Sequence, residues 1–370
     1  MTVEKSTMRS SDFGVLEVGQ FFCPVDPVMH PDAAKTHEQS GQWAQHVGVV
    51  RTSAELDRWL ASTSADFYGG MVPHADPDRF QVAANWVYWG FSFDDTRCDE
   101  VRASREATGL LPVAQRVLRV LETEDEQVAD NDRHLGALCD LARSYRRLGT
   151  AVQTERWIHA HRRWLFAAAT QRALRSAAGK VGVDDYFRTR LHDAGGPPTQ
   201  AMFEFANAAE VPGAEMDSPR VRAVTELFWM IPALDNDLVS RHKEILGHQD
   251  DYNVVSILST AYGIDEEEAV SMATAWRDRM MVLFLRLREQ IAAGKASAAL
   301  RIYLDSLGHG IRANIDWSLR TPRYNTLYQQ DGVTPSKHLE LCGSFRETPT
   351  DSSCAPLPVP SLAWWWSQLD

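Results

Sequence analysis

Two polar clusters, far apart in the chain, carry the residue types best suited to chemistry. In the second cluster, Asn236, Ser240 and Glu244 recur every four residues. On a helix their side chains form one stripe, with a rise of about 6 Å per step. Each side chain presents oxygen, and rigid oxygen ligands suit Mg²⁺. In the first cluster, Asp95 and Asp99 are also one helical turn apart. Two such faces that meet across a cavity would hold metal ions and, through them, a polyphosphate.

The first cluster, Asp94 to Glu100, follows an apolar run over residues 86–93. Acidic residues at the C-terminus of a helix are unfavourable, because the helix dipole places partial negative charge there. A solvated helix end, which often carries acidic residues, is the alternative interpretation. We favour a bound cation, which would offset the repulsion.

The second cluster is the more specific one. Its motif consists of Asn236, Asp237, Ser240 and Glu244. Four fixed residue types match by chance on the order of once in several hundred chains of this length. The polar face of a surface helix is the alternative, but the preceding residues 227–234 are apolar around the whole helix and predict burial. A polar stripe that leads out of a buried helix indicates a lined cavity.

The elements that must position these clusters are helices. From Ala33 to about residue 320 the dominant hydrophobic period is helical, and strand patterns are nearly absent. Thr52 with Glu55 predicts a capping box, and Asp76 followed by Pro77 predicts a helix start. Further helices are expected near residues 106–123, 131–147, 151–178, 198–210, 218–246, 252–261, 264–292 and 295–320. The pattern predicts an all-α protein whose long helices surround a shared core.

Composition divides the chain into three parts. Residues 1–32 are expected to form an irregular N-terminal arm, and residues 33–324 one α-helical domain. Residues 325–370 are rich in Pro, Ser and Thr and are expected to form a flexible tail. The closing Trp364–Trp366 run is unusual in a solvated tail, so we expect it to fold back onto the body or to mediate association.

Bulk composition narrows the class of partner and compartment. The chain has 370 residues, of which 44% are hydrophobic, so it can bury a large core. Its formal charge of −12 argues against a nucleic-acid or anionic-membrane surface. Five cysteines without paired spacing are typical of reduced thiols, and no apolar run approaches the length of a membrane span. We therefore expect a cytoplasmic protein.

Other catalytic motifs are weaker. The twelve histidines show neither HExxH nor Cys/His zinc spacing, and a GxxxxGK[ST] phosphate loop is missing. His159 and His161, beside Arg162 and Arg163, are expected on a solvated helix face.

The two clusters resemble the motifs of bacterial class I terpene synthases, which carry an Asp-rich motif on one helix and an Asn-Ser-Glu motif on another. The family also has a diphosphate-sensing Arg before the second motif, which falls on Arg190 here. It is followed by a linker, Asp193, and by an effector whose backbone carbonyl faces the substrate, Ala194. Many relatives have glycine at the effector position, so Ala194 is a departure. The Gly-Gly-Pro-Pro run at 195–198 is expected to end that helix.

Two further positions fit the resemblance, which covers about residues 20–325. An Arg-Tyr pair follows the last long helix in the family, and Arg323 with Tyr324 fits it. Lys243 fits the basic residue often found just before the motif's Glu. The implied diphosphate-binding residues are Arg190, Lys243, Arg323 and Tyr324. The implied metal ligands are Asp94, Asp95, Asp99, Asn236, Ser240 and Glu244.

The resemblance implies the class I terpenoid synthase fold, a single large helical bundle around a central active-site cavity. Three Mg²⁺ ions would bridge the diphosphate of a linear isoprenoid to the two motifs. Departure of diphosphate leaves an allylic carbocation, which aromatic faces stabilise by roughly 2 kcal/mol or more when desolvated. Candidate lining residues are Phe91, Trp89, Phe228, Trp229 and Trp317. Core packing is the alternative for each of them. We favour Phe91, one turn before Asp95, and Trp317.

The implied activity is Mg²⁺-dependent cyclisation of farnesyl or geranylgeranyl diphosphate. Gly90, one turn before Asp94, would leave room for the longer substrate, whereas bacterial relatives commonly use the shorter one. A chain-elongating prenyltransferase is the enzymatic alternative, but it needs two Asp-rich motifs. A non-catalytic helical binding protein is the other alternative, and it predicts damaged metal ligands. An antiparallel homodimer is common in such relatives.

Overall fold

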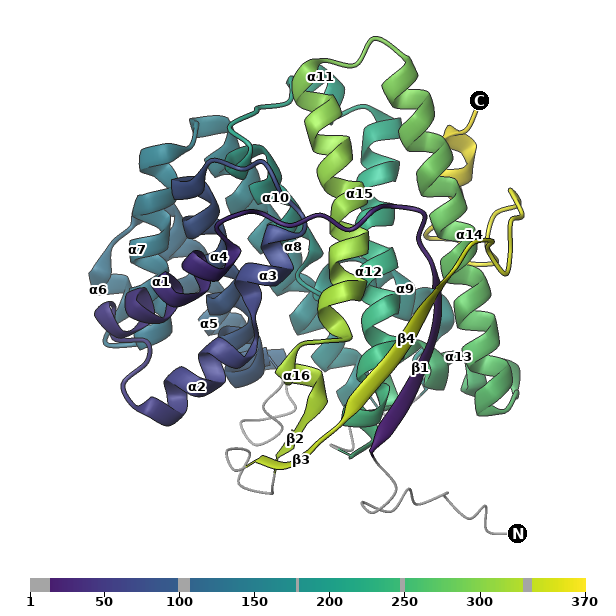
Figure 1. Ribbon diagram of the computed structural model, residues 1–370, viewed down its shortest axis with the longest axis horizontal. Coiled ribbons are helices and arrows are strands. Elements are labelled where there is room, and N and C mark those ends of the chain that lie inside the picture. The colour runs from purple at the N-terminus through teal and green to yellow at the C-terminus, as the bar shows by residue number, and fades with distance from the viewer. Residues whose placement is uncertain (1–13, 99–106, 178–179, 247–249, 329–334) are drawn as a thin grey trace.

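The computed structural model describes residues 14–98, 107–177, 180–246, 250–328 and 335–370 (Figure 1). Its helices are α1 (Ala33–His46), α2 (Ser53–Ala61), α3 (Ser64–Gly69), α4 (Pro77–Phe93), α5 (Ala107–Thr123), α6 (Glu126–Ala129), α7 (Arg133–Leu148), α8 (Ala151–Ser176), α9 (Val183–Asp193), α10 (Gly196–Ala206), α11 (Gly213–Met216), α12 (Pro219–Leu246), α13 (Val254–Tyr262), α14 (Glu266–Ala293), α15 (Ala298–Ser318) and α16 (Pro322–Asn325). The all-α prediction is confirmed.

Local signals in the sequence explain how several helices begin. Thr52 and Glu55 form a reciprocal capping box at the start of α2. The Asp76 side chain accepts hydrogen bonds from the backbone N–H groups of Asp78 and Arg79, and Pro77 opens α4. The predicted long helices agree with the observed ones to within a few residues. The short helix α9 is missing from the predicted stretches. It ends at Asp193, just before the Gly-Gly-Pro-Pro run that we expected to end it, and α10 already begins at Gly196 within that run.

The ends of the chain form a strand pair that the sequence did not indicate. Strand β1 (Val15–Phe22) pairs in parallel with β4 (Glu340–Arg346), and the pair crosses the faces of α12 and α14 (Figure 1). A smaller antiparallel pair joins β2 (Thr326–Tyr328) to β3 (Pro335–His338). The prediction of an irregular N-terminal arm is therefore wrong for residues 15–22. Because the partner strands lie at opposite ends of the chain, no local pattern could reveal them.

The segment after β4 is packed, and the expectation of a flexible tail is wrong for it. Leu357, Val359, Leu362 and Trp365 are buried against the body. The Trp365 indole N–H donates to the Glu226 carboxylate on α12 at 2.8 Å. The physical reason is that scattered apolar residues in a Pro-rich segment can bury side chains without a helical or strand period, which a composition-based prediction misses.

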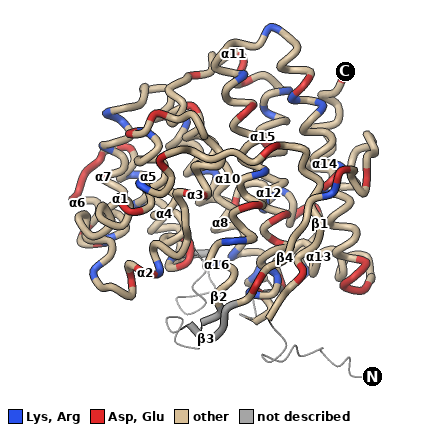
Figure 2. The backbone as a smooth tube through the Cα atoms, in the orientation of Figure 1, with Lys and Arg blue, Asp and Glu red and all other residues tan. Residues whose placement is uncertain are grey.

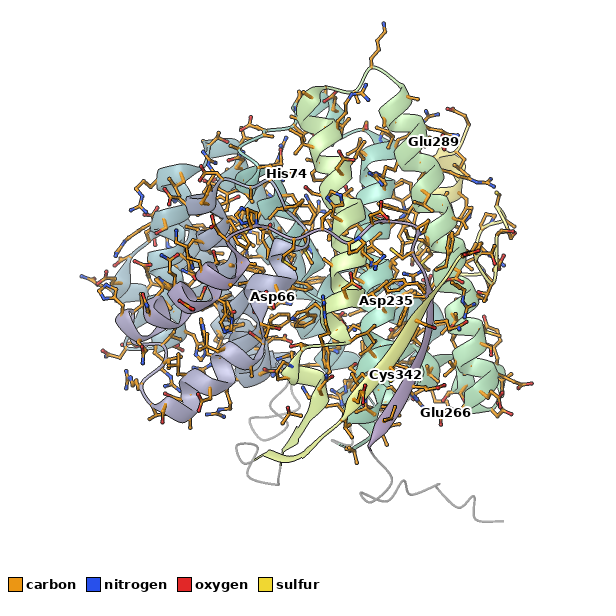
Figure 3. The ribbon with its side chains drawn as sticks, in the orientation of Figure 1. Asp66, His74, Asp235, Glu266, Glu289 and Cys342 are labelled. Carbon is orange, nitrogen blue, oxygen red and sulfur yellow. The ribbon has the colours of Figure 1, made fainter. Side chains whose placement is uncertain are left out.

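Helix α12 runs through the middle of the bundle, between α14, α15 and α9 (Figure 1). Over the backbone as a whole, acidic and basic residues are interspersed (Figure 2). Asp235, labelled on α12 in Figure 3, is fully buried and forms a two-pronged ion pair with Arg277 of α14 at 2.7 and 3.2 Å. A desolvated carboxylate needs such a partner, so the pair fixes α12 against α14.

One histidine lies elsewhere than expected. His161 is buried, accepts from the Trp86 indole N–H at 3.0 Å and donates to the Trp157 carbonyl at 2.8 Å. The predicted solvated position is wrong for His161, because α8 is enclosed along that side by aromatic residues of α4, whereas His159 is exposed. In the described ranges, every helix is too short or too polar to cross a lipid bilayer.

We predict that Trp365→Ala lowers the free energy of unfolding by about 3–5 kcal/mol, because it empties a filled site and leaves the buried Glu226 carboxylate with Arg222 but without its indole partner. Trp364→Ala is the matched control. Trp364 is half-buried under the Arg222 guanidinium, so its loss should cost less than about 1 kcal/mol. Urea unfolding followed by circular dichroism checks both. Equal midpoints for Trp365→Ala and the wild type would mean that the tail adds no stability.

Candidate active site

The oxygen stripe predicted on α12 exists and is internally aligned. The Ser240 hydroxyl lies 2.7 Å from the Asn236 carbonyl oxygen and 2.5 Å from a Glu244 carboxylate oxygen. The other Glu244 oxygen accepts from the Asn253 side chain at 2.9 Å. Asn253 is fully buried and caps α13, so its position is fixed. The Ser240 and Glu244 side chains are thus held in line, with Ser240 also bonded to the backbone of Asn236.

This stripe faces a cavity of about 210 Å³. Residues of α4, α9, α12, α15 and α16 line it, and the described lining residues include Phe67, Phe91, Asp94, Arg190, Ala194, Phe228, Trp229, Asn236, Ser240, Lys243, Glu244, Trp317, Arg323 and Tyr324. Residues far apart in the sequence therefore meet at one site. Gly90 and Trp89 are absent from this lining, so room left by Gly90 is not part of the described cavity.

Arg190 joins α9 to the start of the stripe. Its guanidinium donates to Asp193 at 3.1 Å, to the Asn236 side-chain oxygen at 3.0 Å and to Asp237 at 2.5 Å. Burial raises the pKa of Asp193 to about 6, although the Arg190 charge opposes that rise. Arg190 is itself buried, so its charge depends on these carboxylates.

The Asp237 carboxylate joins α12 to α9 and α13. The sequence did not reveal this role. Asp237 accepts from the Tyr186 hydroxyl and, at 2.8 Å, from the backbone N–H of Val254 at the start of α13. With Arg190, these contacts tie α9, α12 and α13 to one carboxylate. The presence of Asp237 inside the motif was the available signal, but its contacts with α9 and α13 follow only from the packing.

The acidic cluster follows α4 as a π-helical turn, Asp94–Cys98. Asp94 lines the cavity. Asp95 instead forms an ion pair with Arg323. Although some desolvation opposes it, the positive charge of Arg323, and then that of Lys243, holds the pKa of this half-exposed carboxylate below its ordinary value. Asp99 lies outside the described residues. The structure thus brings Asp94 to the cavity and pairs Asp95 with a cation beside it.

The Arg-Tyr pair on α16 closes the same side of the cavity. The Tyr324 hydroxyl accepts from the Asn236 side-chain N–H at 2.6 Å. The Lys243 ammonium lies 6.0 Å from the centre of the Tyr324 ring. Arg323 lies over the Phe91 ring at 4.7 Å. Three cationic side chains, Arg190, Lys243 and Arg323, therefore border the oxygen stripe.

Aromatic side chains form the deeper wall. Phe91 and Trp317 stack with ring centres 5.2 Å apart and planes 9° from parallel. Phe67, which the sequence analysis did not single out, contacts both rings, with centre distances of 5.7 and 4.7 Å. Because Phe67 comes from the short helix α3, far from either motif, no spacing could have identified it.

The break between α9 and α10 shapes another part of the wall. Ala194 ends α9 and lines the cavity. Gly195 follows with φ +74°, a left-handed conformation that favours glycine. At Gly196, a Cβ atom would lie 3.1 Å from the Trp229 side chain, so the backbone there approaches the indole closely. Gly195 thus allows the tight turn, and Gly196 leaves room for the Trp229 indole beside it.

The charges at this site suit a cation-bridged anion. Burial, together with the nearby Asp237 carboxylate, raises the pKa of Glu244 to about 7. A cation beside Glu244 would favour its charged form. The side chains that face the cavity offer oxygen atoms of a carboxylate, an amide and a hydroxyl as ligand atoms, and this set fits a hard divalent metal ion. The bordering Arg and Lys side chains can bind the anion that such a metal ion attracts.

Known proteins are similar to this chain in both sequence and fold. A family model described as "Terpene synthase family 2, C-terminal metal binding" matches residues 85–281. Spiroviolene synthase from Streptomyces violens is 38% identical, over 95% of this chain and 97% of its own. Phomopsene synthase from Allokutzneria albata is 33% identical, over 97% and 99%. A crystal structure of an SVS_A2 protein from ancestral sequence reconstruction is 39% identical and superposes with a TM-score of 0.83, over 94% of this chain and 98% of that one.

The family match covers just over half of the chain, and the relatives match nearly all of it. Their agreement with the cavity geometry leaves one conclusion. The chain belongs to the bacterial class I terpene synthases and is a terpene cyclase.

Proposed function

We propose that this cyclase ionises farnesyl or geranylgeranyl diphosphate with the help of three Mg²⁺ ions and closes the resulting carbocation into a ring. The observation that carries the proposal is the arrangement of the cavity: one side presents oxygen-bearing side chains together with cationic ones, Arg190, Lys243 and Arg323 among them, and the other presents aromatic rings. A diphosphate suits the first side and a hydrocarbon chain suits the second.

The polar side binds the diphosphate. Asp94, Asn236, Ser240 and Glu244 would hold the metal ions, with Asp99 and Asp95 as further carboxylates of the first cluster. When bound there, Mg²⁺ would supply positive charge that makes diphosphate a better leaving group. Arg190, Lys243 and Arg323 add fixed positive charge, and each arginine can bind two oxygens at once. The Tyr324 hydroxyl, 2.6 Å from Asn236, is near enough to donate to the same anion.

Binding of the anion to Arg190 would draw that guanidinium away from its carboxylates. Asp193 lies one turn along α9 and is bonded to Arg190 at 3.1 Å, and Ala194 follows it at the cavity wall. A change at Arg190 is thus transmitted to the Ala194 carbonyl, whose dipole can stabilise positive charge on the substrate. This assigns Arg190, Asp193 and Ala194 to the sensing of diphosphate.

The aromatic side protects the carbocation. Phe91 and Trp317 present stacked rings, and Phe67 adds a third. These faces exclude water and attract a cation, each by about 0.5–2 kcal/mol. A chain-elongating prenyltransferase would need a second carboxylate-rich motif where this chain has Asn236 and Ser240, so it is not favoured.

The direct test is incubation of purified protein with Mg²⁺ and, separately, geranyl, farnesyl and geranylgeranyl diphosphate. We expect a cyclic hydrocarbon or alcohol from the C15 or the C20 substrate, detected by gas chromatography–mass spectrometry. Chelation of the metal by EDTA should abolish it, and added Mg²⁺ should restore it. Release of linear alcohols alone would contradict cyclisation, and product formation in EDTA would contradict the metal requirement.

Substitution in the oxygen stripe tests the ligand assignment. Asn236→Ala and Glu244→Ala should each lower turnover by more than about 100-fold, because each removes an oxygen that the metal ion needs. Far-ultraviolet circular dichroism should show an intact helical fold. Glu266→Ala is the control, since that carboxylate is exposed and pairs with Arg241 on the surface. Near-normal turnover by Asn236→Ala would remove the stripe from the mechanism.

Lys243 and Arg241 provide a matched pair on one helix. Lys243 lines the cavity, whereas Arg241 bonds Glu266 and Ser256 outside it. Lys243→Gln should lower kcat/KM by about 10- to 100-fold, the value of a hydrogen bond to a charged group. Arg241→Gln should stay within about twofold of the wild type. Steady-state kinetics of diphosphate release compare the two. Equal losses would indicate a general charge effect instead of contact with the diphosphate.

A further inference from the structure

Thr63 has an unusual backbone conformation for its residue type. It connects α2 to α3 with φ 44° and ψ 40°, in the left-handed region. Within the described residues, five non-glycine residues have positive φ, and Thr63 is the one whose β carbon is branched. A branched β carbon makes this conformation costly. Such a residue persists where its surroundings demand it, so the contacts of Thr63 need an explanation.

The Thr63 hydroxyl holds the cavity residue Trp317. The Trp317 indole N–H is shared between the Ser62 carbonyl at 2.8 Å and the Thr63 hydroxyl at 3.0 Å. Trp317 is otherwise enclosed by rings, since it stacks on Phe91 and contacts Phe67. The indole N–H is therefore the polar point that fixes the ring's rotation against Phe91.

The same hydroxyl reaches the segment that carries the Arg-Tyr pair. Thr63 donates to the Thr321 hydroxyl at 3.3 Å. Thr321 is buried and caps α16, where its side chain accepts from the backbone N–H of Arg323 at 3.4 Å. One hydroxyl thus connects an aromatic wall residue with the start of the helix that presents Arg323.

The Thr63 backbone determines where Phe67, the third aromatic residue of the wall, is placed. Its carbonyl accepts from the N–H groups of Asp66 at 3.0 Å and Phe67 at 3.2 Å, which begins α3. Figure 3 labels Asp66 on this helix, next to Phe67 in the chain. The left-handed turn at Thr63 aims α3 so that Phe67 meets Trp317 with a ring distance of 4.7 Å. Glycine or asparagine would adopt the turn more easily, but neither offers a hydroxyl at that point.

We propose that Thr63 is a positioning residue that fixes the rings of Trp317 and Phe67 relative to Arg323, and thereby selects which cyclic product forms. The inference rests on the proposed cyclisation and adds a specificity determinant to it. A carbocation that can close in several ways follows the contour of the wall around it. Rotation of the Trp317 indole would change that contour without touching the metal stripe.

The product test uses three variants. Thr63→Val keeps the branched shape and removes the hydroxyl, and Thr63→Ser keeps the hydroxyl. Thr170→Val is the control, because the Thr170 hydroxyl bonds only its own helix at Phe166 in the described structure. We expect the share of the main product to fall at least about twofold in Thr63→Val, and to stay near the wild-type share in Thr63→Ser and Thr170→Val. Unchanged product shares in Thr63→Val would overturn the proposal.

A second experiment tests the contact without turnover. In a double-mutant cycle with Trp317→Phe, which lacks the indole N–H, the melting temperatures of all four proteins are compared. Thr63→Val should lower Tm by about 2 °C in the wild-type background and by less than half of that beside Trp317→Phe. Additive shifts would overturn the contact. If the wild type converts no prenyl diphosphate, the proposed function fails, whereas this cycle still decides whether Thr63 holds Trp317.

Discussion

Buried charge on α12 is the constraint on which the rest of the structure depends. Successive helical residues point about 100° apart, so Asp235, Asn236 and Asp237 face three directions. Asp235 meets Arg277 of α14, Asn236 faces the cavity, and Asp237 meets Arg190 of α9. Removing a carboxylate from water costs several kcal/mol of free energy unless it is paired with a cation. Few arrangements of the neighbouring helices satisfy both carboxylates of α12. The position of the oxygen stripe is thereby set by ion pairs that α12 makes with α14 on one side and with α9 on the other.

The same logic governs the cations at the cavity. Arg190 and Arg323 are held by Asp237, Asp193 and Asp95. Compensated in this way, they can remain charged at a buried site without a bound anion. In the proposed function, an incoming diphosphate would exchange partners within this existing network of charges. Preorganised charge of this kind is what electrostatic catalysis requires.

Much of the site could be predicted because helical spacing is local. Asn236, Ser240 and Glu244 share a face because they are spaced four residues apart on a helix. The glycines and prolines that follow Asp193 predict the helix break there. What could not be predicted depends on contacts between distant segments. The pairing of β1 with β4, the packed tail and the approach of Phe67 to Trp317 leave no local period. The diversion of Asp95 to Arg323 likewise follows from where α16 lies, which the sequence of the first cluster does not encode.

The parallel pair of β1 and β4 has a consequence for synthesis of the chain. As the protein emerges from the ribosome, β1 appears first and must wait unpaired until β4 follows. The Arg323–Tyr324 segment lies between α15 and β4, and the Asn325 carbonyl is bonded to the N–H of Leu339 just before that strand. Contacts between residues so far apart in the sequence form late, because the entropic cost of closing the long loop comes before the contact can stabilise it. We therefore expect the segment between α15 and β4, which carries Arg323 and Tyr324, to take its final place late in folding, when β4 pairs with β1.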